Sequence, residues 1–119
     1  MNFSFTQNKS AHVTVFFLQG RLMEKHHATA LINEIENALA NGCNKFILNL
    51  EKLEYLNSTG LGVLISLYTK IRNHSGELIL SNISEPVKKL ILISKLNSVF
   101  TIIENTDDAK KYFQTKPIS

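Results

Sequence analysis

The segment between residues 45 and 71 constrains the fold more than any other part of the sequence. Residues 45–50 form a nearly continuous apolar run, which is typical of a strand that is covered on both faces. Residues 57–60 are small and polar and end in a glycine, and residues 61–71 then repeat apolar side chains at helical spacing. We therefore predict a central strand over residues 45–50, a turn with Ser58 at its tip, and a helix over residues 61–71.

Strand and helix patterns alternate along the rest of the chain. Phe3 and Phe5 alternate with polar residues, and residues 12–18 are rich in valine and phenylalanine, which predicts a hairpin with a turn at residues 8–10 and Gly20 as the end of its second strand. The later segments predict a helix over 28–41, a strand over 78–80, a helix that begins at 84–86, a strand over 99–103 and a short helix from 105 to 113. The order ββαβαβαβα predicts an α/β fold with a mixed, mostly parallel β-sheet packed with helices, in which the N-terminal hairpin adds an antiparallel edge. We expect one domain over residues 1–119, with a C-terminal tail over residues 113–119.

Several residues near helix starts suggest specific local roles. Ser84 and Thr106 precede helical patterns, so we expect their hydroxyl groups to act as N-caps. From its spacing alone, Ser58 is also expected to be an N-cap or turn hydroxyl. Gly62 lowers the intrinsic stability of its helix by about 1 kcal/mol relative to alanine, and close packing against a neighbour would explain its presence.

Composition and charge argue against several functional classes. The formal net charge is +3, but the basic residues are scattered and there is no tryptophan, so nucleic acid is not expected as a partner. No apolar run approaches the length of a membrane span, and the first residues do not resemble a secretion signal. The single cysteine, Cys43, excludes an internal disulfide and is expected to pack as a small hydrophobe. These features fit a protein of the reducing cytoplasm that has no membrane partner.

Residues that could carry out catalysis are few. Ser58 has no neighbouring base and is therefore not an activated nucleophile, although it could accept a phosphoryl group from another protein's active site. Gly60 and Gly62 are only a fragment of a dinucleotide-binding motif. His26 and His27 are adjacent, which points them in different directions on a helix, and no cysteine or acid is spaced to complete a metal site. We therefore expect neither an enzyme nor a bound metal or cofactor.

The segment around Ser58 closely resembles a known family. Residues 56–64, Leu-Asn-Ser-Thr-Gly-Leu-Gly-Val-Leu, together with the preceding strand, resemble the strand, Asp-Ser-Ser-Gly-Leu-Gly turn and helix of bacterial anti-sigma factor antagonists of the STAS family. The likeness extends to Gly-Arg-Leu at residues 20–22 and to residues 76–82, 87–90 and 96–100. It therefore covers nearly the whole chain.

The resemblance implies a regulatory protein that works by binding. In that family the serine is phosphorylated by a partner kinase that is itself the anti-sigma factor, and the corresponding residue here is Ser58. The unphosphorylated protein captures the anti-sigma factor and frees the sigma factor, whereas the phosphorylated protein releases it. A phosphatase that resets the switch is a further partner that the sequence leaves open. Carried onto this chain, the partner-binding residues are Gly20, Arg21, Met23, Asn57, Ser58, Thr59, Gly60 and Leu61.

Three departures from the family pattern bear on this interpretation. The family has an acid at three positions where this sequence does not. Asn57 stands before the phosphorylated serine, Asn49 at the end of the central strand, and Met23 after the Gly-Arg-Leu segment. Asn57 can still form turn and cap hydrogen bonds, but it removes a negative charge beside the Ser58 hydroxyl. The alternative is a non-switching STAS subunit of a lipid transporter or of a larger signalling complex. The retention of Ser58 in an otherwise matching turn favours the switch.

Overall fold

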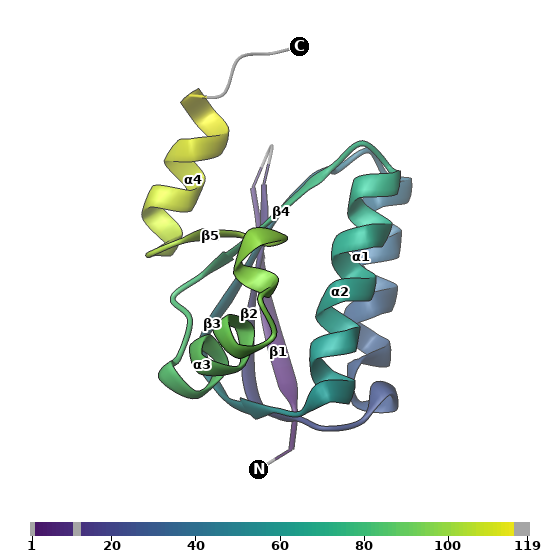
Figure 1. The fold of residues 1–119 in the computed structure, drawn as a ribbon. Coiled ribbons are helices and arrows are strands. Elements are labelled where there is room, and N and C mark those ends of the chain that lie inside the picture. The colour runs from purple at the N-terminus through teal and green to yellow at the C-terminus, as the bar shows by residue number, and fades with distance from the viewer. Residues whose placement is uncertain (1, 11–12, 116–119) are drawn as a thin grey trace.

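The computed structural model describes residues 2–10 and 13–115, which form a five-stranded sheet packed with helices (Figure 1). The strands and α-helices follow one another in the predicted order, with two 3₁₀ helices, η1 and η2, that the sequence did not predict: β1 (Ser4–Lys9), β2 (Thr14–Leu22), η1 (Lys25–Ala28), α1 (Thr29–Ala40), β3 (Lys45–Leu56), α2 (Ser58–Asn73), β4 (Glu77–Ser81), α3 (Glu85–Ile93), η2 (Leu96–Ser98), β5 (Thr101–Ile103) and α4 (Thr106–Thr115). Residues 11 and 12, the second of which begins the predicted second strand, lie outside the described residues. None of the helices in these two stretches is long and apolar enough to cross a membrane.

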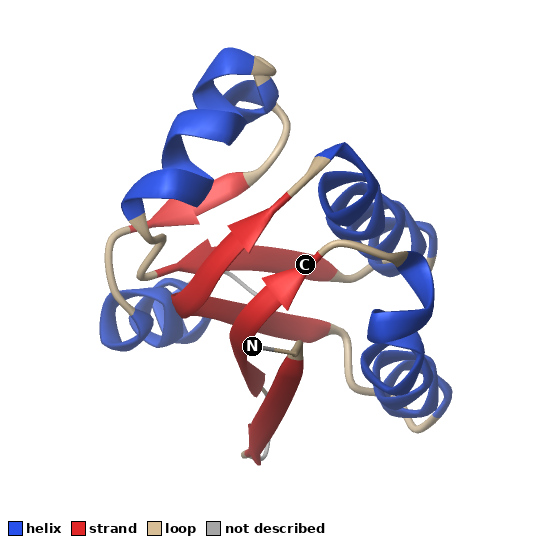
Figure 2. Cartoon of the chain, turned by 90° about the horizontal axis from the view of Figure 1, so that it is seen from below, coloured by secondary structure: helices blue, strands red, loops and turns tan. Residues whose placement is uncertain are grey.

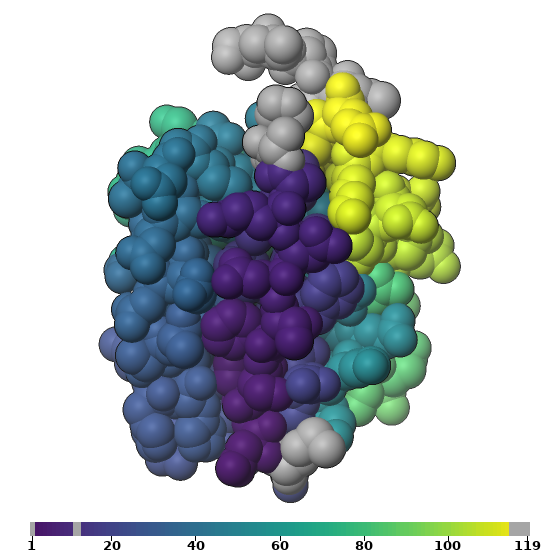
Figure 3. Space-filling model, turned by 180° about the vertical axis from the view of Figure 1, so that it is seen from behind, coloured from purple at the N-terminus to yellow at the C-terminus, as the bar shows by residue number. Residues whose placement is uncertain are grey.

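The strands lie in the sheet in the order in which they occur in the sequence, from β1 to β5. β1 pairs with β2 in an antiparallel arrangement, and the pairs β2–β3, β3–β4 and β4–β5 are parallel. The predicted mixed, mostly parallel sheet with an antiparallel hairpin at its edge is therefore confirmed. In the space-filling view from behind, β1 lies on the surface between the helical segment α1 and the C-terminal helix α4 (Figure 3).

Both faces of the sheet are covered, which explains the apolar run in β3. The helices α1 and α2 lie side by side on one face, where Phe46 and Leu48 of β3 join the larger buried cluster (Figures 1 and 2). Ile47 points to the other face and packs in a second cluster with Ala109 and Phe113 of α4. Successive residues of a strand point to opposite faces, so a strand between two helical layers is apolar at nearly every position.

β2 and β3 extend beyond their predicted ends. β3 continues to Leu56 rather than ending at residue 50, because it stays paired with β2 along a segment whose outward side chains are polar. β2 continues past Gly20 to Leu22, and the pairing shifts register at this glycine. Gly20 has a φ of +90°, and an added Cβ atom would lie 2.2 Å from the Asn2 carbonyl oxygen. The glycine therefore marks a bulge within a strand and not the end of one.

Three further expectations near the helix ends are wrong. Ser84 occupies the N-cap position of α3, but its hydroxyl donates a hydrogen bond to the Leu53 carbonyl oxygen at 2.7 Å instead of capping the helix. Asn105 caps α4 in place of Thr106, since its Oδ1 accepts a hydrogen bond from the Asp108 backbone N–H at 2.8 Å. α4 continues to Thr115, and Phe113 is buried, so residues 113–115 belong to the helix. The rest of the expected tail, residues 116–119, lies outside the described residues.

Cys43 behaves as predicted from the sequence. It is a free cysteine, partly buried, and it packs against the larger core cluster. Its Sγ lies 3.4 Å from Thr14 Oγ1. The thiol therefore fills a small space beside the first parallel strand pair.

A polar network joins the centre of the sheet to the start of α4. Asn49 Nδ2 donates hydrogen bonds to Asn82 Oδ1 at 3.2 Å and to Thr106 Oγ1 at 2.9 Å. Thr106 in turn donates from its backbone N–H to Asn82 Oδ1 at 3.0 Å, and its hydroxyl lies 2.8 Å from Ser81 Oγ. Asn49 also accepts from the Glu51 backbone N–H at 3.0 Å. The amide of Asn49 is thus used on both its donor and acceptor sides.

We expect the substitution Asn49→Asp to lower the free energy of unfolding by about 1–3 kcal/mol, because a carboxylate cannot donate to Asn82 or Thr106. Chemical denaturation at neutral pH measures the effect. Asn33→Asp, at an exposed position of α1, is the matched control and should change stability by no more than about 0.5 kcal/mol. Equal stability of the two variants would show that the network contributes nothing.

Candidate interaction site

The N-terminus of α2 is held in place by the side chain of Asn57. Its Oδ1 accepts a hydrogen bond from the Gly60 backbone N–H at 2.9 Å, and its Nδ2 donates to the Met23 carbonyl oxygen at 3.0 Å. Asn57 has an extended backbone, and its own carbonyl accepts the first helical hydrogen bond, from Leu61 N–H at 2.9 Å. Asn57 is therefore the N-cap of α2, and it also joins the helix start to the segment that follows β2.

Ser58 and Thr59 are the first two residues of α2, and both are exposed. The expectation that Ser58 is a cap or turn hydroxyl is wrong, because Asn57 takes that role. The Ser58 hydroxyl forms no hydrogen bond with any group in residues 2–10 and 13–115. The cap uses the Gly60 N–H and the first helical bond uses the Leu61 N–H, so the amides of Ser58 and Thr59 remain at the positive end of the helix dipole.

Gly60 allows this helix start to approach β2 closely. An added Cβ atom would lie 2.2 Å from the Leu22 carbonyl oxygen and 2.9 Å from the Leu56 Cβ atom. Gly62, by contrast, has no described atom within 4 Å of an added Cβ atom, so the predicted close packing at Gly62 is wrong. The steric requirement for glycine lies two residues earlier in the sequence than expected.

The other residues predicted from the resemblance lie around this helix start, with different exposure. Arg21 is exposed, and its guanidinium carbon lies 5.6 Å from the centre of the Tyr55 ring. Met23 is partly buried and lines an open hollow of about 550 Å³ together with Thr59. Three of the predicted residues, Gly20, Gly60 and Leu61, are buried. The exposed and partly buried members are the ones whose side chains can reach a partner.

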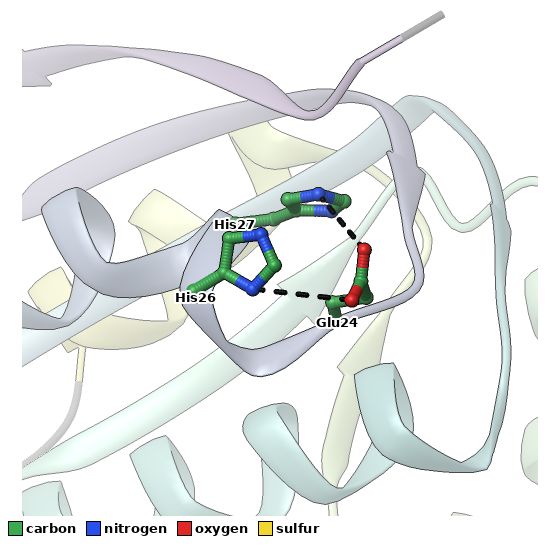
Figure 4. A group of neighbouring side chains, drawn as sticks. All are labelled: Glu24, His26 and His27. Carbon is green, nitrogen blue, oxygen red and sulfur yellow. Dashed lines mark ion pairs between the residues drawn. The ribbon is translucent and has the colours of Figure 1, made fainter.

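The two histidines differ from their predicted arrangement. His26 and His27 lie in η1, and both rings face the carboxylate of Glu24 (Figure 4). The expectation that no acid is spaced to join them is therefore wrong. The signal that could have found this group is the short spacing Glu-x-His-His, read on a tight 3₁₀ turn rather than on an α-helix.

Comparison with known proteins identifies the family. Residues 4–109 match the family model of the STAS domain. The chain belongs to the STAS domain family. The anti-sigma F factor antagonist of Paenibacillus polymyxa is 27% identical to this chain over 111 residues, which cover 92% of this chain and 93% of that protein.

Solved structures of anti-sigma factor antagonists share the fold of this STAS domain. SpoIIAA in its unphosphorylated form gives a TM-score of 0.80 at 22% identity, and the match covers 97% of this chain and all 100% of SpoIIAA. The phosphorylated form of the Bacillus SpoIIAA gives a TM-score of 0.72 at 22% identity, over 95% of this chain and 100% of that one. The resemblance to the STAS antagonists is thus confirmed at the level of family and fold.

The structure shows what Asn57, Asn49 and Met23 do at the three positions where the family pattern of the STAS domain has acids. Asn57 donates to the Met23 carbonyl oxygen, which an aspartate could not do. Asn49 belongs to the network that holds α4 and takes no part in the site at α2. Met23 lies beside Thr59 at the hollow and leaves this position without a charge. The helix start thus has neither of the two acids that the pattern would place next to it.

Proposed function

We propose that this STAS domain is an anti-sigma factor antagonist that is switched by phosphorylation at Ser58. In its unphosphorylated form it binds an anti-sigma factor with serine kinase activity, in the cytoplasm, and so frees the sigma factor. The contact is made by a docking surface that we define as Arg21, Met23, Asn57, Ser58 and Thr59. The observation that carries the proposal is the exposed Ser58 hydroxyl, which has no hydrogen bond to the described residues and stands at a helix start that Asn57 already caps.

The geometry at Ser58 suits a hydroxyl that must be reached by another protein's active site. A serine that capped its own helix would have to break that hydrogen bond before it entered a kinase. Here the cap is a different residue, and the Ser58 side chain is left exposed at the first helical position. Phosphoryl transfer can therefore occur without unwinding the helix.

The antagonist acts through binding and needs no catalytic group of its own. Ser58 has no histidine, lysine or carboxylate within hydrogen-bond distance in the described residues, so nothing activates it as a nucleophile. The names of the related antagonists support the same class of function. We infer that the kinase supplies the chemistry and that this domain supplies the acceptor and the docking surface.

Substitutions that add charge to the docking surface test its position. We expect Met23→Glu and Thr59→Glu each to lower the affinity for the anti-sigma factor by roughly tenfold or more, because a buried, unpaired charge at an interface costs more than about 1.4 kcal/mol. Thr69→Glu, at an exposed position of the same helix, is the matched control and should leave the affinity unchanged. Isothermal titration with the purified anti-sigma factor gives the affinities, and thermal melts check that each variant is folded.

Calorimetry tests the position of the interface, and recovery of bound partners from cells separates the switch from the alternative function. Equal affinity of both Glu variants and the wild type would place the interface elsewhere. Recovery of transporter ATPase subunits from cells, without any kinase-like protein, would favour a non-switching subunit of a lipid transporter. Recovery of a kinase-like anti-sigma factor supports the proposed antagonist.

A further inference from the structure

A carboxylate and two imidazole rings converge at the start of η1, beside the docking surface but not part of it (Figure 4). Glu24 Oε1 lies 4.0 Å from His26 Nδ1, and Glu24 Oε2 lies 3.5 Å from His27 Nε2. One ligand atom from each of these three residues lies within 4.8 Å of the others. The arrangement comes entirely from four consecutive residues, so it forms wherever this turn forms.

Both distances are too long for hydrogen bonds, and the shorter one matches the distance between two ligands of one metal ion. Hydrogen bonds from nitrogen to oxygen span about 2.7–3.2 Å, so neither ring satisfies the Glu24 carboxylate as it stands. With metal–ligand bonds of about 2.0–2.2 Å, two donors on one tetrahedral ion lie roughly 3.3–3.5 Å apart. The His27 pair, at 3.5 Å, already has this spacing, whereas the His26 pair, at 4.0 Å, must close for a cation between the three groups to bind all of them.

The donor set indicates the class of ion. Imidazole nitrogen suits zinc and its neighbours in the first transition series, and carboxylate oxygen is a common third ligand of zinc. We propose that Glu24, His26 and His27 bind a divalent transition-metal ion, with Zn²⁺ as the best match. Three protein ligands leave at least one coordination position for water or for a side chain of another protein.

The surroundings allow the ion to enter and the ligands to adjust. Glu24 and His26 have side chains that are 62% and 71% exposed, so both can rotate toward a shared ion. The ring of His27 is less exposed, at 29%, and its Nδ1 is buried without a hydrogen-bond partner in the described residues, which leaves Nε2 as the ligand atom. The open hollow lined by Met23, Glu24, Lys25, His26, Thr29 and Thr59 gives access from solvent.

The positive charge of Lys25 should lower the affinity of such a site for a cation. It is exposed, and it lines the same hollow as Glu24 and His26. Its positive charge offsets the negative charge of Glu24, so the site should bind less tightly than a buried zinc site with several anionic ligands. Lys25→Gln should accordingly bind Zn²⁺ at least as tightly as the wild type.

Calorimetric titration of the purified full chain with ZnCl₂ alone tests the proposal. We expect one Zn²⁺ per chain, released by EDTA, and an affinity that falls by about tenfold or more in Glu24→Gln and in His26→Ala. His74→Ala is the matched control, because His74 is exposed at the far end of α2, with its ring nitrogen 2.9 Å from the Lys70 carbonyl oxygen. Circular dichroism checks that these surface variants are folded.

The visible spectrum of the Co²⁺-loaded protein identifies the ligands independently. Nitrogen and oxygen ligands give weak d–d bands that should be lost in His26→Ala, whereas a thiolate adds an intense charge-transfer band. Failure of the wild type to bind Zn²⁺, unchanged affinity in Glu24→Gln and His26→Ala, or a thiolate band from Cys43 would overturn the proposal. None of these measurements requires the anti-sigma factor, so the result is independent of the proposed antagonist function.

Discussion

Phosphorylation of Ser58 should lower the affinity for the anti-sigma factor by about two orders of magnitude or more, while the domain itself stays folded. A phosphoserine adds about −1.5 to −2 charges at neutral pH. At a docked interface this charge must leave water and face a surface that is shaped for a neutral hydroxyl, which can cost several kcal/mol. Each 1.4 kcal/mol lowers the affinity about tenfold, so the loss should be large.

The free domain should tolerate the charge of a phosphate on Ser58, because that phosphate lies at the N-terminus of a helix. The backbone N–H groups of Ser58 and Thr59 lie at the positive end of α2, and the first turn, Ser-Thr-Gly-Leu, contains no acid. A helix N-terminus of this kind favours an anion. With Asn57 and Met23 in place of acids, the phosphate also meets no negative charge at either position. We therefore expect the thermal stability of the phosphorylated domain to match or exceed that of the unmodified one.

Two substitutions separate the charge from the hydroxyl. Ser58→Ala should keep full affinity and lose at most about 0.5 kcal/mol of stability, since Asn57 and not Ser58 caps the helix. Ser58→Asp should weaken binding only in part, because it carries one charge and fewer acceptor oxygens than a phosphate. Thr59 is the competing phosphate acceptor, because it is exposed and follows Ser58 in the helix.

Mass spectrometry after reaction with the cognate kinase and ATP locates the phosphate, and calorimetry measures the affinity of each form. Phosphate on Thr59, or full affinity of the Ser58-phosphorylated protein, would remove the central claim. Loss of affinity accompanied by unfolding would show that the switch acts through the fold instead.

The fold could be predicted from the sequence wherever buried apolar side chains recur in the pattern typical of a strand or a helix. Residues 46–48 are apolar at successive positions because helices cover both faces of β3, and this pattern was sufficient to place the strand at the centre. The later part of β3, from Glu51 to Leu56, carries mostly exposed polar side chains. Its strand character depends on pairing with β2, which no local pattern reveals, so the predicted strand was too short.

The helix caps were mispredicted for a similar reason. Ser84 and Thr106 are the residue types that cap helices, but both hydroxyl groups are used by distant partners: the Leu53 carbonyl for Ser84 and the Asn82 side chain for Thr106. Asn57 caps α2 through the nearby Gly60 N–H, and its amide is also held by the Met23 carbonyl, 34 residues away in the sequence. Local propensity identifies residues that can cap a helix, and tertiary contacts decide which of them do.

Gly60→Ala should destabilise the domain by about 1–3 kcal/mol, although alanine is the better helix former by about 1 kcal/mol. The added methyl group would meet the Leu22 carbonyl oxygen at 2.2 Å and Leu56 Cβ at 2.9 Å. Atoms at these distances must move, and one of them is backbone within the sheet. Gly62→Ala adds the same methyl group to the same helix where no described atom lies within 4 Å, so it should be neutral or stabilising by up to about 1 kcal/mol.

The pair of alanine variants thus separates close packing from helix propensity, and it also bears on function. To accommodate the methyl group that Gly60→Ala adds, the start of α2 must move away from β2, which would strain the Asn57 hydrogen bond to the Met23 carbonyl and shift Ser58 relative to Met23. We expect Gly60→Ala to lose both thermal stability, by roughly 4 °C for each kcal/mol, and the rate of phosphorylation at Ser58. Gly62→Ala should keep both, because the helix start does not move. Equal melting temperatures for the two variants would show that the approach of α2 to Leu22 is looser than the structure indicates.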